Sequence, residues 1–124
     1  MEIAIWIFSI ALALFFAAAG FTKSFSPVAE VRKMPWTKGF KDSTIRLIGY
    51  SEIVGAVGLV APLATGILVW LAAVAAACLS ILMFGATATH VRIKDPVSAA
   101  VTSAVLASAS LALAILSAIN QIIR

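Results

Sequence analysis

Four long apolar runs occupy most of this 124-residue chain, over about residues 3–21, 45–61, 67–89 and 96–119. A helix needs about 20 apolar residues to cross the hydrocarbon core of a bilayer, with a lower limit of about 17. Because lipid leaves exposed backbone groups without partners, spanning segments form helices or closed barrels, and continuous apolar runs indicate helices. The sequence therefore predicts an all-α membrane protein, a bundle of four transmembrane helices in one domain over residues 1–124.

Composition supports a lipid environment and argues against nucleic acid as a partner. The chain is 63% hydrophobic and 11% charged, whereas soluble domains are about 45–50% apolar and about 25% charged. A soluble domain of this size could not bury so much apolar surface. The net charge of +4 comes from basic residues that flank the apolar runs, as in membrane proteins. The single cysteine, Cys78, is expected to be a packed thiol, and no Cys/His cluster suggests a metal.

The distribution of lysine and arginine predicts the topology. Eight basic residues lie in or beside the segments 22–44 and 90–95, and one, Arg124, lies on the other side. Since cytoplasmic loops of membrane proteins carry the excess of basic residues, we expect a multi-pass protein of the cell (inner) membrane, with both segments in the cytoplasm and both termini outside. Asp95 and Pro96 are expected to start the last helix as N-cap and first-turn proline.

The long segment 22–44 contains a short stretch with helical spacing. Ser26 is a candidate N-cap, and Val28, Val31 and Met34 recur every three residues before a stop at Pro35. This pattern predicts a short amphipathic turn or helix at the membrane interface between the first two spans. A mobile linker is the alternative.

Glu52 is the most unusual residue of the second span. It lies seven residues after Ile45 in an otherwise apolar run, where an isolated carboxylate would cost several kcal/mol. Its helical neighbours Gly49, Gly55 and Ala56 are small, and small residues mark the faces along which membrane helices approach closely. We therefore expect Glu52 to face protein and to be paired with a cation, protonated or reached by water.

Other polar residues are predicted to converge near Glu52. Lys23 ends the first span, Arg46 begins the second and His90 ends the third, so the topology places all three at one level. Glu52 is about 10 Å deeper, at about 1.5 Å per residue. A lysine side chain can reach much of that distance. The sequence thus predicts a polar pocket lined by Lys23, Arg46, Glu52 and His90, with further candidates Gly49, Tyr50, Gly55, Ala56, Ala86 and Thr87. An ion pair that merely holds the helices in register is the alternative.

Several of these segments resemble the DoxX-like family of small four-helix membrane proteins. The first span closes with "AAAGFTKSF", the loop carries "MPW", the second span reads "RLIGYSEIVGAVGLVAP" and the third ends with "MFGATATHVR". They are similar to the family's Gly-x-x-Lys, Arg-x-x-Gly-x-x-Glu-x-x-Gly-Ala-x-Gly-Leu and Met-x-Gly-Ala-x-x-x-His patterns over almost the whole chain. By position, the resemblance implies Lys23, Arg46, Glu52 and His90 as site residues and adds Met83 to the pocket candidates.

The resemblance implies two kinds of function. Some relatives in the broader group are linked to quinone-coupled thiosulfate oxidation or to membrane redox defence with soluble oxidoreductases, and animal relatives assist receptor assembly. Our first hypothesis is a pocket around Glu52 that binds a lipophilic molecule, with a quinone as one candidate, in a redox-linked process. The sequence has no flavin or haem signature, so electrons would come from a partner or bound cofactor.

The second hypothesis is a non-catalytic membrane subunit or assembly factor for a partner membrane protein. Association of the chain with further copies of itself, as a homo-oligomer, also remains an alternative. In the fourth span, one face is traced by Ala100, Ala104, Ser108 and Leu111, with Ala107 beside it. That face could contact another protein, but we expect it to pack within the bundle.

Overall fold

The computed structural model describes residues 2–94 and 97–123, without the side chain of residue 36. The regular elements of these residues are all helical: α1 (Glu2–Phe25), α2 (Val28–Val31), the 3₁₀ helix η1 (Pro35–Gly39), α3 (Asp42–Thr65), α4 (Trp70–Arg92) and α5 (Val97–Ile123). Helices α1, α3, α4 and α5 are each long and apolar enough to cross a membrane. The predicted all-α bundle of four transmembrane helices is therefore confirmed.

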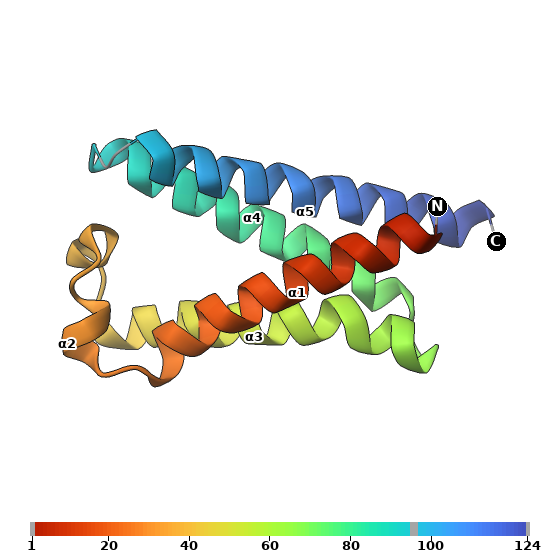
Figure 1. The fold of residues 1–124 in the computed structure, drawn as a ribbon, viewed down its shortest axis with the longest axis horizontal. Coiled ribbons are helices and arrows are strands. Elements are labelled where there is room, and N and C mark those ends of the chain that lie inside the picture. Colours follow the sequence, from red (N-terminus) through yellow and green to blue (C-terminus); the bar gives the residue numbers. More distant parts are fainter. Residues whose placement is uncertain (1, 95–96, 124) are drawn as a thin grey trace.

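The four long helices form two antiparallel pairs. Helix α1 packs along α3, α4 packs along α5, and the pairs meet mainly through α3 and α4. The start of α1 and the end of α5 lie at one end of the bundle, and α2, the end of α4 and the start of α5 lie at the other (Figure 1). The two pairs diverge toward the α2 end. This divergence leaves room for a cavity between them, which is described below.

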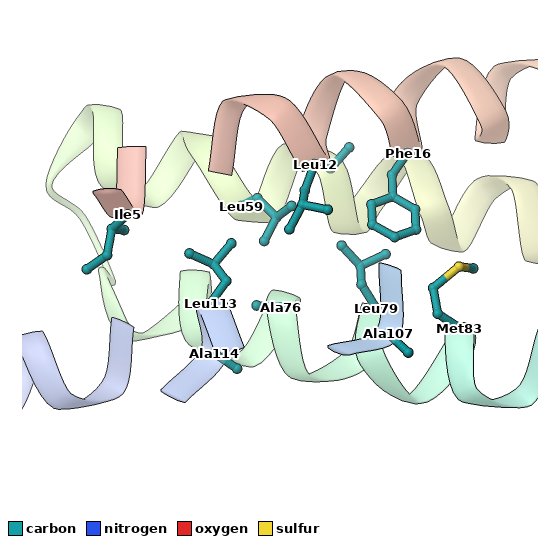
Figure 2. Packing of buried hydrophobic residues seen from close by; sticks show 11 residues of the cluster. Ile5, Leu12, Phe16, Leu59, Ala76, Leu79, Met83, Ala107, Leu113 and Ala114 are labelled. Carbon is teal, nitrogen blue, oxygen red and sulfur yellow. The ribbon is translucent and has the colours of Figure 1, made fainter. Parts of the chain in front are cut away.

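The core lies where the two pairs meet. Phe16 from α1, Leu59 from α3, Leu79 from α4 and Leu113 from α5 are at most 2% exposed, and Figure 2 shows them pointing toward one another. The outward faces are as apolar as the core, with Ile81 72% exposed as an example. A bundle that is apolar on its outside as well as its inside suits a lipid environment.

The end of the second long helix differs from the one that the sequence indicated. Pro62 was expected to end the second helix, but α3 continues through it to Thr65. The helix ends where Gly66 adopts a left-handed conformation (φ 70°) and donates its N–H to the Pro62 carbonyl at 3.0 Å. A proline removes one backbone hydrogen bond, which membrane helices tolerate. The predicted cap at Asp95 and Pro96 lies outside the described residues.

The fourth helix buries a different face from the predicted one. Ser108 and Leu111 are exposed, so the expectation that the face through Ala100, Ala104, Ser108 and Leu111 packs in the bundle is wrong. The buried positions are Ser103, Ala107, Ser110, Leu113, Ala114 and Ser117. Ser80 of α4 donates to the Ala107 carbonyl at 2.9 Å, which shows how closely the two backbones approach. Cys78 was also expected in the core but is exposed on α4.

The segment between α1 and α3 forms two short helices rather than a linker. Helix α2 has Pro27 as its N-cap, so the predicted cap at Ser26 is wrong. Val31 is buried, as its spacing indicated. Arg32 holds the segment to the start of α3: it donates from Nε and Nη2 to Asp42 Oδ1 at 3.0 and 2.6 Å and from Nη1 to the Thr37 carbonyl at 2.5 Å.

Candidate functional site

Two glycines bring α1 and α3 into backbone contact at the candidate site. A Cβ atom added to Gly20 would lie 2.6 Å from the Gly49 carbonyl oxygen, and one added to Gly49 would lie 2.8 Å from the Gly20 carbonyl oxygen. Real Cβ atoms do not approach other atoms so closely, so the crossing requires glycine on both helices. Lys23 lies three residues after Gly20, and Glu52 three residues after Gly49, so this crossing sets the two charged side chains against each other.

Lys23 and Glu52 form an ion pair inside the bundle. Lys23 Nζ donates to Glu52 Oε1 at 2.7 Å and to Oε2 at 3.0 Å. The Glu52 side chain is 1% exposed and that of Lys23 is 16% exposed. The structure therefore supplies the cation that the buried carboxylate requires, and it selects Lys23 from the two basic partners that the sequence offered.

Arg46 has a different place in the site. Its Nη1 donates to the Lys23 backbone carbonyl at 2.9 Å. That carbonyl lies in the last turn of α1, where backbone oxygens lack helical partners. Arg46 thus joins the end of α1 to α3 and is not among the described residues that line the cavity. Its role in the structure is to hold the helix that carries Lys23.

A cavity of about 470 Å³ extends from the Lys23–Glu52 pair toward α4 and α5. Its walls are mainly apolar, and its polar side chains come from all four long helices. The described residues that line it are Phe15, Ala19, Lys23, Met34, Phe40, Ile48, Glu52, Leu82, Met83, Ala86, Thr89, His90, Ser98, Ala99, Thr102, Ser103 and Leu106. Phe15 on α1 and Thr102 on α5 are also exposed, so exposed side chains of these two helices border the cavity.

The secondary candidates divide between the cavity and the helix contacts. Met83 and Ala86 line the cavity. Gly55 packs against the Leu79 side chain of α4, and Ala56 is 4% exposed in the core. Their small size allows close packing of the helices, and neither Gly55 nor Ala56 is among the described residues that line the cavity.

Two further candidates lie away from the cavity walls. Tyr50 is 46% exposed, and its ring lies 6.0 Å from that of Phe25. Thr87 donates to the Met83 carbonyl at 2.9 Å and shares a 2.9 Å hydrogen bond with Ser103 Oγ. Thr87 therefore supports one wall of the cavity through Ser103 without being among its described lining residues.

Sequence reasoning missed the contributions of the loop and of α5. Met34 and Phe40 cover one side of the cavity from the segment between α1 and α3, and Ser98, Thr102 and Ser103 bring hydroxyl groups from α5. The early hydroxyl residues of the fourth span were visible in the sequence. Whether these hydroxyl residues line the cavity depends on how α5 is rotated about its axis. The sequence of an almost uniformly apolar helix does not reveal that rotation.

The side chains present suit hydrogen bonding and proton exchange more than metal binding. Among the described residues, no three His, Cys, Asp or Glu side chains group together as a metal site would require. Lys23, Glu52 and His90 provide one ammonium, one carboxylate and one imidazole around the same cavity. These groups can donate to or accept from a polar head group, while the apolar walls accommodate a hydrocarbon chain.

Comparison with known proteins places the chain in a family. A model described as "DoxX-like family" matches residues 7–115, a range that includes Lys23, Arg46, Glu52 and His90. The chain belongs to the DoxX-like family. The resemblance seen in the sequence is thus confirmed, and the protein is a small DoxX-like membrane protein with four membrane-spanning helices. No curated protein and no solved structure matches the chain.

Proposed function

We propose that this DoxX-like protein binds a lipophilic molecule in the cavity beside the Lys23–Glu52 ion pair, with the polar head of that molecule at the pair. The observation that carries the proposal is a cavity of about 470 Å³ that reaches a buried ion pair within a membrane bundle. Small-molecule sites are typically concave, about 300–1,000 Å³ in volume and mostly apolar, with a few polar groups that fix orientation. This cavity has each of those properties.

The ion pair has a second feature that supports a binding role. Helices held in register by a salt bridge need the pair but need no empty volume beside it. Here Glu52 lines the cavity as well as accepting both hydrogen bonds from Lys23. Intramembrane ionisable residues are costly and are functional candidates by default. A quinone or quinol is one ligand of suitable chemistry, since its oxygens hydrogen bond and its tail is apolar.

We also propose that the cavity lies in the cytoplasmic half of the membrane. The eight basic residues in or beside segments 22–44 and 90–95 support this orientation. The cavity is lined by Met34 and Phe40 of the first of those segments and lies at the α2 end of the bundle. An amphiphile in the inner leaflet could therefore enter between α1 and α5.

The proposal is tested by binding of decylubiquinone to the protein in lipid nanodiscs. Glu52→Gln keeps the shape of the side chain but removes its charge, and we expect it to weaken binding by about tenfold, the effect of about 1.4 kcal/mol. Glu30→Gln is the matched control, because Glu30 pairs with Lys33 on the exposed surface at 3.1 Å. Thermal unfolding of both variants is measured in parallel.

Two results would contradict the proposal. If nanodiscs with wild-type protein bind no more decylubiquinone than empty nanodiscs, the protein has no binding site for this probe. A folded Glu52→Gln variant with unchanged affinity would show that the carboxylate does not contact the bound head group. Either result would favour a structural role for the ion pair in a membrane subunit or assembly factor.

A further inference from the structure

The charges that line the cavity cancel one another. Among the described lining residues, Lys23 supplies the one ammonium and Glu52 the one carboxylate. Because the two side chains are hydrogen bonded, the pair has no net charge wherever the shared proton lies. A ligand that approaches the pair therefore meets a strong dipole with no net charge.

Arg46 and Arg32 are not among the described residues that line the cavity, and each makes hydrogen bonds elsewhere. The Arg46 guanidinium donates to the Lys23 carbonyl, and Arg32 donates to Asp42 and to the Thr37 carbonyl. A phosphate head group is usually bound by arginine or lysine side chains that give it charge-assisted hydrogen bonds. A cationic head group would need the carboxylate of Glu52, both of whose oxygens already accept from Lys23.

The hydroxyl groups of the cavity wall offer acceptors. Thr89 donates to the Gly85 carbonyl at 3.0 Å, and Thr102 donates to the Ser98 carbonyl at 2.7 Å. A hydroxyl has one hydrogen and two lone pairs. When the hydrogen is directed to the helix backbone, the oxygen remains able to accept a hydrogen bond from a ligand.

From this arrangement we infer that the cavity selects amphiphiles whose head group is uncharged and carries a hydroxyl, as in a long-chain alcohol, phenol or quinol, over those with a phosphate or ammonium head. This inference rests on the proposed function and specifies its ligand class. An uncharged hydroxyl can donate to the threonine oxygens of the wall and needs no counter-charge. A charged head would instead enter a low-dielectric site without a counter-charge, which is costly.

A series of three probes with one tail tests the inference. Farnesol, farnesyl monophosphate and farnesylamine share their hydrocarbon chain and differ in the charge of the head. Binding to the protein in phosphatidylcholine nanodiscs is measured at pH 8, and uptake by empty nanodiscs is subtracted. We expect farnesol to bind at least about tenfold more tightly than either charged probe, since an unpaired buried charge costs more than one factor of ten.

Charge variants provide the matched prediction. Glu52→Gln leaves the site with one net positive charge, so the preference should move toward farnesyl monophosphate by about tenfold or more. Lys23→Gln leaves one net negative charge and should move the preference toward farnesylamine. The double variant, Lys23→Gln with Glu52→Gln, is neutral and should again prefer farnesol. Folding of each variant is checked by thermal unfolding, and the comparison of probes on wild-type protein needs no variant.

The outcomes separate this inference from the proposed function. Tightest binding of farnesyl monophosphate or farnesylamine to wild-type protein would overturn the inference but leave a ligand-binding cavity in place. Folded variants that bind all three probes in the wild-type order would also overturn it. If neither the farnesyl probes nor decylubiquinone binds above the empty nanodiscs, the proposed function fails and the inference fails with it.

Discussion

Replacing Gly20 by alanine should loosen the contact between α1 and α3 that sets Lys23 against Glu52. The new Cβ atom would lie 2.6 Å from the Gly49 carbonyl oxygen and 2.8 Å from Cγ1 of Ile53. The first of these neighbours is backbone and cannot rotate away, so the helices must separate or tilt. A matched control exists at Gly85 in α4, where an added Cβ would meet nothing within 4 Å.

The control isolates the steric cost. Both substitutions gain the same preference of a helix for alanine over glycine, about 0.5–1 kcal/mol. The difference in stability between the variants is therefore the cost of overpacking alone, typically about 1–3 kcal/mol. We expect a value in the upper half of that range, because the substitution acts on a backbone contact between two long helices. Gly85→Ala should be as stable as the wild type or more stable.

Unfolding of each variant is followed by circular dichroism while dodecyl sulfate is titrated into dodecyl maltoside micelles. The midpoint for Gly20→Ala should fall clearly below that for Gly85→Ala. Equal midpoints would refute the claim that a glycine crossing holds α1 and α3 in contact. The position of Lys23 relative to Glu52 would then need a different explanation.

Three further predictions concern the ion pair, the topology and the loop. Replacing Lys23 or Glu52 alone should lower the free energy of unfolding by about 3–5 kcal/mol, and replacing both should lower it by less than the sum of the two losses. Strict additivity of the unfolding free energies in a double-mutant cycle would exclude the coupling. In a cysteine-free background, Lys38→Cys should react with an impermeant thiol reagent only from the cytoplasmic side, and labelling of intact cells from outside would reverse the topology. Arg32→Gln should raise the rate of amide hydrogen exchange across residues 28–40. Lys33→Gln should not, because it breaks an exposed ion pair that contributes little to stability. Equal exchange rates in both variants would show that Arg32 does not anchor the segment.

The sequence predicted the burial of Glu52 for a sound physical reason. Small residues at helical spacing around a carboxylate indicate a face against protein, and Glu52 is 1% exposed with Gly49 and Ala56 buried beside it. Its partner could not be chosen in advance between Lys23 and Arg46. Both are long cations at one level of the membrane, and only the directions of their side chains separate an ion pair from a backbone contact.

The cavity walls from the loop and from α5 could not be predicted in the same way. In a soluble helix the polar face marks the outside, but in a membrane both faces are apolar and small residues occur on each. Thus Ser108 and Leu111 were assigned to the inner face of α5, whereas Ser103 and Ser110 occupy it. The rotation of α5 is decided by contacts such as that of Ser80 with Ala107, which depend on the whole bundle.

The most direct test of a ligand at the ion pair is a crystal structure of the protein grown in a lipidic mesophase that contains decylubiquinone. The cavity predicts elongated density with its polar head at hydrogen-bonding distance from Lys23, Glu52 or His90 and its tail beside Leu82 and Leu106. A cavity closed by its own side chains, with the Lys23–Glu52 pair intact and no ligand density beside it, would contradict the account.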